Sequence, residues 1–313
     1  MASIRLDDSE EQRSCPKGVV LIPAWRRPEM LWHCLANIKR AECAGQMHYI
    51  FRFDQGHSPE LHDVIRGFDF SHEVLVTPPS KYLLTKQSYS LLTGYAAAVQ
   101  RCDQGGLVFM IEEDVMVATD FFRFHQEVHE QNEHLFCSIA VANPNRRDIH
   151  RTTEGNPEWY YLSSGDYCSL GVAFRPEVLR DVVLPHASPA YYAQPHSYCR
   201  KIWPKSPIGE AFVEQDGLIR RQQMDTTMPI AYPWRPRAYH AGLYGKNRGP
   251  GPSGSFAKRL EYVTEVIYSD EAMRTFAKHQ EWYEDSRPID LNAQPWQQLT
   301  NVPINNDLHP VRF

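Results

Sequence analysis

Three consecutive acidic residues, Glu112, Glu113 and Asp114, follow directly after the apolar run at residues 107–111. That run has the length and composition of a strand buried inside a sheet, so the acids are expected at its carboxyl end. Open α/β sheets bind ligands outside the carboxyl ends of their strands. Carboxylates at such a place can hold Mn²⁺ or Mg²⁺ against phosphate oxygens. Most runs of acidic residues are solvated loops. Here the buried strand directly before the three acids favours a metal site instead.

Two further polar loops are expected at the same sheet edge, since each follows a predicted strand, at residues 18–22 and 49–53. The candidate binding residues in these loops are Pro23, Ala24, Arg26, Arg27, Asp54, Gln55 and Gly56. Arginine side chains there can face a phosphate or a base, and Asp54 can accept a hydrogen bond from a base or a ribose. An ordinary polar turn is the alternative for residues 54–56. Together the three loops predict a crevice that a nucleotide can fill.

The elements that would position these loops alternate along the chain. The spacing of apolar residues and helix propensity predict helices at residues 29–40, 61–68 and 87–101 and a further short strand at 74–76, and the pattern loosens beyond residue 141. This alternation is typical of an α/β fold with a mostly parallel central sheet flanked by helices. No G-x-G-x-x-G follows the first strand and no P-loop motif occurs, which argues against dinucleotide dehydrogenases and P-loop kinases.

The order of motifs resembles that of GT-A (Rossmann-like) glycosyltransferases. Its parts are strand–Pro-Ala-x-Arg-x-Pro, strand–Asp-Gln-Gly-His, and strand–Glu-Glu-Asp followed by Val-Met-Val-Ala-Thr-Asp-Phe-Phe, and the likeness covers residues 18–142 best. It is nearest to the inverting N-acetylglucosaminyltransferases that begin complex N-glycan branching and to related bacterial and phage glycosyltransferases. The resemblance implies that Asp54 lies in the nucleotide pocket, that Asp114 holds the metal and that Glu113 lies near the ribose or donor sugar. Glu112 and Glu113 both depart from the family's DxD motif, and Glu112 is a further candidate nucleotide-sugar-binding residue whose specific role the resemblance does not define.

A weaker likeness extends into the second half of the chain. Residues 212–221 resemble the acidic, helix-opening segment that supplies the general base in inverting enzymes of this fold, with Asp216 the first candidate and Glu214 the second. Acids that simply favour a helix N-terminus are the alternative. Residues 237–249 resemble the loop that closes over the donor, so His240 is a candidate metal ligand. The further candidate donor-binding residues are Lys86, Lys246 and Arg248.

We divide the chain into four predicted regions. Residues 1–17 form an N-terminal arm, 18–142 a nucleotide-sugar-binding subdomain, 143–249 an acceptor-side catalytic subdomain, and 250–313 a C-terminal extension with one helix at 256–267 and a polar tail. The function implied by the resemblance is transfer of a sugar from a nucleotide diphosphate donor, with UDP-sugars favoured, to a hydroxyl group. The acceptor classes left open are a glycan, a protein and a hydroxylated DNA base.

Composition adds few constraints. The formal net charge of −5 over 313 residues gives no overall attraction to nucleic acid. Seven single cysteines without a CxxC pair favour reduced thiols, and no apolar segment predicts a signal or a membrane span. We therefore expect a cytoplasmic protein without membrane insertion, in the host cytoplasm if it is encoded by a phage.

Several other features of the sequence allow different interpretations. His125 and His129 have metal-binding spacing, but their helix is rich in polar residues, so a solvated helix face is expected. The aromatic clusters at residues 159–161, 191–192 and 203 predict either core or a stacking platform. A nucleotidyltransferase uses similar strand-end acids with metal, and a catalytically silent nucleotide-sugar or carbohydrate-binding protein on the same scaffold is the third possibility.

Overall fold

The computed structural model describes residues 4–5, 17–78, 86–141, 159–164, 167–205, 214–233 and 236–240. Their strands are β1 (Ile4–Arg5), β2 (Gly18–Ala24), β3 (His48–Phe53), β4 (His72–Val76), β5 (Leu107–Met110), β6 (Val115–Val117), β7 (Cys137–Ile139), β8 (Trp159–Ser163), β9 (Val172–Phe174), β10 (Ile230–Pro233) and β11 (Ala238–His240). In the described part, nine strands form one sheet in the order β1-β8-β10-β7-β9-β5-β2-β3-β4, and β11 pairs with β6 in a second, small sheet.

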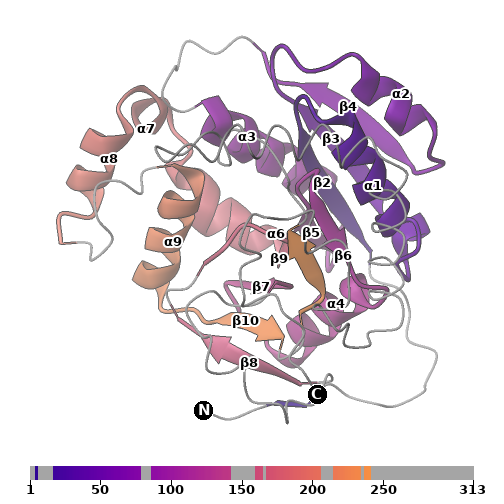
Figure 1. Ribbon diagram of the computed structural model, residues 1–313. Helices are drawn as coiled ribbons and strands as arrows, with labels where there is room; N and C mark the ends of the chain where they lie inside the picture. Colours follow the sequence, from indigo (N-terminus) through magenta and orange to yellow (C-terminus); the bar gives the residue numbers. More distant parts are fainter. Residues whose placement is uncertain are drawn as a thin grey trace, which may run out of the picture.

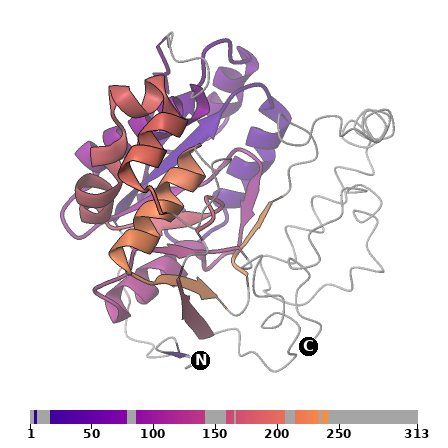
Figure 2. The same ribbon diagram turned by 90° about the vertical axis from the view of Figure 1, so that its left-hand side faces the viewer.

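The helices lie on both faces of the large sheet (Figures 1 and 2). They are α1 (Pro28–Ile38), α2 (Glu60–Arg66), α3 (Lys86–Arg101), α4 (Phe121–Gln131), α6 (Pro176–Val178), α7 (Pro189–Ala193), α8 (Pro195–Ile202) and α9 (Gln215–Thr226), with 3₁₀ turns at Ala44–Gln46 and Leu184–His186 and a π-helical segment at Leu179–Val183. Helices α1 and α2 pack together, whereas α3 packs against β2 and β3 and contacts α9. The α/β architecture predicted from the sequence is confirmed.

The first half of the sheet is parallel because helices connect its strands. β2 pairs in parallel with β3 and β5, and β3 pairs in parallel with β4. Nearly every side chain of β2 is buried, as expected of a strand covered on both faces. In register, Leu21 lies between Ile50 and Met110, so these three strands end at one edge of the sheet.

The second half of the sheet is mixed. β9 is antiparallel to both β5 and β7, β10 is parallel to β7, and β8 is antiparallel to β10. The sheet thus runs continuously across the predicted boundary at residue 142, and the division into subdomains stays a prediction. The helix predicted at residues 256–267 and the whole region from 250 onward lie outside the described residues. No helix in the described ranges is long and apolar enough to cross a membrane.

The prediction of a solvated face for His125 and His129 on α4 is wrong. Both side chains are buried, with 0% and 3% of their surface exposed. The ring of His125 packs edge-on against Phe121, with centroids 4.6 Å apart, and its Nδ1 lies 2.6 Å from the hydroxyl of Ser138. Burial is feasible because a neutral imidazole can share a hydrogen bond in the core, and burial lowers the pKa of His129 to about 3.

Cysteine chemistry also departs from expectation at one position. Cys34, Cys102, Cys137, Cys168 and Cys199 are free thiols. Cys43, however, is disulfide-bonded. The prediction that all cysteines are reduced is therefore wrong at Cys43, and cysteine usage no longer supports a reducing compartment.

Candidate functional site

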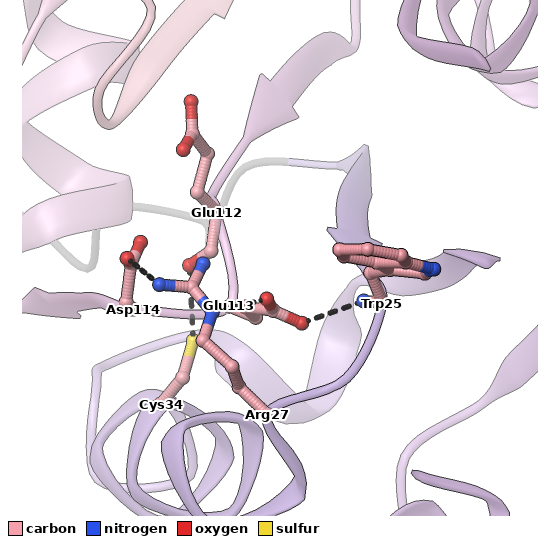
Figure 3. Close-up of polar contacts among 6 residues, drawn as sticks. All are labelled: Trp25, Arg27, Cys34, Glu112, Glu113 and Asp114. Atoms are coloured by element: carbon pink, nitrogen blue, oxygen red, sulfur yellow. Dashed lines mark hydrogen bonds and ion pairs between the residues drawn. The ribbon is translucent and has the colours of Figure 1, made fainter. Parts of the chain in front are cut away.

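The three acids lie where two neighbouring parallel strands end. β5 stops at Met110, and residues 112–114 fill the turn between β5 and β6. The backbone N–H of Ile111 donates to the carbonyl of Leu21 at 3.1 Å, which keeps the chain after β5 beside β2. Because β2 leads directly into residues 25–27, its loop meets the acidic turn (Figure 3).

Arg27 binds two of the acids at once. Its Nε lies 2.6 Å from Glu113 Oε1, and its Nη1 lies 2.6 Å from Asp114 Oδ2. Glu113 and Asp114 are each only 4% exposed. Glu113 Oε2 also accepts the backbone N–H of Trp25 at 2.9 Å. The negative charge of the buried acid pair is therefore balanced in part by the Arg27 guanidinium.

The balance of charges in this cluster is reflected in the direction of each pKa shift. Burial lowers the pKa of Arg27, but the carboxylates of Asp114 and Glu113 outweigh it and hold this pKa above its ordinary value. Burial raises the pKa of Glu113, against the opposing effect of Arg27. Since arginine stays protonated in proteins, the guanidinium can leave the acids only by moving away from them.

Glu112 points away from this pair, as Figure 3 shows. Its Oε1 lies 3.3 Å from the hydroxyl of Ser169, and the same hydroxyl lies 3.3 Å from Asp216 Oδ2 on α9. Burial, with the charges of Asp114 and Asp216, raises the pKa of Glu112 to about 8. Ser169 therefore joins the sheet-edge acids to the acid of the second half, which is a connection that sequence analysis missed, since no motif marks this serine.

The residue before Asp216, Gln215, is bound to α3. The backbone N–H of Gln215 donates to Ser88 Oγ at 3.0 Å, and Ser88 Oγ donates to Gln215 Oε1 at 3.1 Å. Burial raises the pKa of Asp216 to about 6, with Glu214 adding to the shift and Ser169 opposing it. Glu214 stands at the N-cap of α9 with an exposed side chain, so of the two predicted base candidates only Asp216 faces the acid cluster.

The two nucleotide-loop predictions come together through Trp25 and Arg26. Arg26 Nε donates to the carbonyl of Gly56 at 2.8 Å, and Trp25 Nε1 donates to the carbonyl of Gln55 at 3.3 Å. Gly56 has a φ of +73°, a conformation that glycine tolerates and other residues rarely adopt. The Trp25 ring lies 4.5 Å beneath the Arg26 guanidinium and is 42% exposed. An exposed aromatic face beside two polar loops offers a stacking surface that sequence analysis did not select.

The remaining predicted residues fall into two groups. Pro23 and Ala24 belong to β2 itself. The carbonyl of Ala24 accepts a hydrogen bond from the backbone N–H of Asp54 at 3.3 Å. Asp54 Oδ1 in turn accepts a hydrogen bond from the hydroxyl of Thr77 at 3.2 Å. His240 pairs in register with Val115, which places its backbone next to Asp114.

The structure does not describe the side chains of the remaining predicted site residues. The side chains of His240 and Lys86, and the whole of Lys246 and Arg248, lie outside the described residues. In the parts of the chain that the structure covers, no three His, Cys, Asp or Glu side chains form a ready-made metal cluster. A metal bound by one or two carboxylates with phosphates and water does not need such a cluster.

No protein-family model and no curated protein matches this sequence. Three solved structures similar to this chain are glycosyltransferases. Mouse xyloside xylosyltransferase 1, in its apo form, is 13% identical over 67% of this chain and 82% of that chain, with a TM-score of 0.40. A mannosyltransferase from Pyrobaculum calidifontis in complex with GDP-Man and Mn²⁺ is 10% identical over 87% of this chain and 86% of that chain, with a TM-score of 0.42. The galactosyltransferase LgtC in complex with donor and acceptor sugar analogues is 9% identical over 82% of this chain and 99% of that chain, with a TM-score of 0.41. Likenesses this distant do not assign an activity.

Proposed function

We propose that this protein is a metal-dependent glycosyltransferase that moves a sugar from a nucleotide diphosphate donor to a hydroxyl acceptor with inversion. The observation that carries the proposal is that Glu112, in the acidic turn that also holds Asp114, lies 3.3 Å from the Ser169 hydroxyl, which lies equally close to Asp216 on α9. Metal-dependent sugar transfer with inversion uses one acid to hold a cation at the departing phosphate and another to accept the proton of the acceptor hydroxyl.

On the donor side, Asp114 is the proposed metal ligand and Glu113 lies beside it. Their oxygens are hard ligands of the kind that Mn²⁺ and Mg²⁺ prefer, and they already hold the cationic guanidinium of Arg27. A bound divalent cation would neutralise charge that develops on the leaving diphosphate. Arg27 can bind the diphosphate in the bidentate manner typical of arginine. We place the nucleoside between the Trp25–Arg26 loop and Asp54.

On the acceptor side, Asp216 is the proposed general base. The acceptor oxygen forms its bond to the anomeric carbon while the bond from that carbon to the phosphate oxygen breaks, and the hydroxyl proton passes to Asp216. A pKa of about 6 leaves this carboxylate ionised at neutral pH yet basic enough to accept a proton in the transition state. Oδ1 of Asp216 is buried and has no hydrogen-bond partner among the described residues, whereas Oδ2 lies 3.3 Å from the hydroxyl of Ser169.

The test is a donor panel. Incubation with UDP-, GDP-, ADP- and dTDP-sugars and Mn²⁺ is expected to release the nucleoside diphosphate slowly from one donor class, even without acceptor. D114N should abolish metal-dependent release, whereas D103N, which changes an exposed aspartate after α3, should behave like wild type. D216N should keep thermal stabilisation by donor and metal but lose transfer once an acceptor is known.

Other results would point to the alternatives. Pyrophosphate release from a nucleoside triphosphate would identify a nucleotidyltransferase. Donor binding with no turnover, on glycan, protein and hydroxymethylated DNA acceptors alike, would identify a silent binding protein. The acceptor is proposed only as a hydroxyl-bearing molecule of one of these three classes.

A further inference from the structure

Arg27 occupies the position that the proposed function gives to a metal. Two of its nitrogens each lie 2.6 Å from a different carboxylate, and both of those carboxylates are nearly inaccessible to solvent. Two neighbouring ionised acids with so little access to water repel each other strongly unless a cation lies between them. A metal that binds between the two acids must therefore displace this guanidinium.

We propose that Arg27 is a built-in counter-ion for Glu113 and Asp114, which a divalent metal replaces only when a diphosphate is present to receive the displaced guanidinium. This inference rests on the proposed function, because it adds an order of binding to the same site. Metal and nucleotide would then enter as one unit, and neither would bind well alone.

The energetic argument follows from what each partner can offer Arg27. Metal alone would replace the guanidinium between the acids, and Arg27 would lose both of its ion pairs there. A diphosphate supplies a replacement anion, since it can accept paired hydrogen bonds from a guanidinium. Nucleotide would therefore raise metal affinity, and by thermodynamic reciprocity metal would raise nucleotide affinity by the same factor.

The placement of Arg27 suits such an exchange. Its side chain is 18% exposed, so it stands at the mouth of the acid cluster rather than beneath it, and it precedes the first turn of α1. Arg26 is not an equivalent replacement, because its Nε is engaged by the carbonyl of Gly56 in the other loop. Figure 3 shows the Arg27 guanidinium directed at the acid turn.

The experiment compares wild type with R27Q and with the matched control R101Q. Arg101 also pairs with a carboxylate, Glu73, with Nη2 2.8 Å from Oε2, but on the exposed surface at the end of α3. Binding of Mn²⁺ alone is measured by electron paramagnetic resonance of the free ion. Coupling between metal and nucleotide binding is measured from thermal unfolding: the Tm shift with Mn²⁺ and UDP together is compared with the sum of the shifts that each causes alone. Inorganic pyrophosphate replaces UDP as a second probe, which lacks the base and the ribose.

We expect R27Q to bind Mn²⁺ alone at least about tenfold more tightly than wild type and R101Q. Without ligand, R27Q should melt roughly 5–10 °C lower than wild type, because the buried acids lose their ion pairs with Arg27, and Mn²⁺ alone should restore most of that loss. In wild type, Mn²⁺ together with UDP should stabilise more than the separate shifts add up to, and the excess should shrink in R27Q.

Two outcomes would overturn the inference in distinguishable ways. Equal Mn²⁺ affinity of wild type and R27Q would show that Arg27 does not compete with metal, and the proposed metal site would survive. Absence of Mn²⁺ binding by both proteins, with or without UDP, would remove the metal site and the inference together. If R27Q does not fold, R27K is used, since its single ammonium cannot span both acids as the guanidinium does. R27K is expected to bind Mn²⁺ alone more tightly than wild type, and equal affinity would again count against the inference.

Discussion

The hydroxyl of Ser88 on α3 forms two hydrogen bonds with Gln215, the first residue of α9, although 127 positions separate them in the chain. One bond satisfies a backbone N–H at the start of α9, where no earlier helical carbonyl is available. The other fixes the Gln215 side chain. Since Asp216 is the next residue, the serine sets the position of the proposed base.

Replacing Ser88 by Ala should lower both stability and activity. The change removes the acceptor for a buried N–H, so we expect a loss of about 1–3 kcal/mol in the free energy of unfolding, measured in urea. The turnover rate should fall while the KM for the donor changes little, because the substitution displaces Asp216 but not the loops proposed to bind the donor. T226A is the control, since its hydroxyl bonds the carbonyl of Gln223 at the other end of α9. A turnover rate that S88A leaves intact would contradict the positioning role.

The acidic limb of the pH–rate profile should report Asp216. A general base works in its ionised form, so activity should rise with pH through the pKa of about 6 and level off above it. The hydrogen bond from Ser169 lowers this pKa, and S169A should therefore move the limb to higher pH. D216N should lower turnover by roughly 10²–10⁴-fold. A limb that stays in place in S169A would show that another group is titrating.

The buried histidines of α4 should make the fold sensitive to acid. His125 and His129 are held neutral in the folded state, because burial lowers both pKa values, that of His129 to about 3. In the unfolded chain each takes up a proton near pH 6.5, so stability falls as pH drops below that value, by about 1.4 kcal/mol per pH unit for each histidine. For His129 the loss continues until pH nears 3.

Urea unfolding between pH 4 and 7.5 tests this expectation. H129Q should flatten the slope below pH 6.5 relative to wild type, because one proton fewer is bound on unfolding. The comparison is made on slopes, since H129Q also changes packing and shifts stability at every pH. Parallel curves for the two proteins would contradict the assignment.

Close packing of β2 against β5 should make Gly18 irreplaceable. A Cβ at this position would lie 2.5 Å from the carbonyl oxygen of Leu107 and 2.7 Å from the ring of Phe109. G18A should therefore cost about 1–3 kcal/mol of stability by pushing apart the two strands that carry the acid and arginine loops. G45A is the matched control, since a Cβ there meets nothing within 4 Å. Equal stabilities of the two variants would show that the strands can separate freely.

The sequence by itself determined the elements and the edge where they end. Buried strands such as Gly18–Ala24 and Leu107–Met110 are marked by local apolar runs, and the acids that follow the second strand need no distant partner to be noticed. Parallel pairing then brings loops from neighbouring strands to one edge. The sequence therefore predicts that Arg27, Asp54 and Asp114 lie at the same edge of the sheet.

Only the tertiary structure decided what each side chain does at that edge. The choice of Arg27 over Arg26 as the partner of the acids depends on how the loop after β2 turns. The links from Glu112 and Asp216 to Ser169 join residues 57 and 47 positions apart, and no local pattern encodes them. The burial of His125 likewise depended on Ser138 being opposite it. Contacts of this kind arise when separate elements pack together, so periodicity and spacing, which describe one element at a time, cannot reveal them.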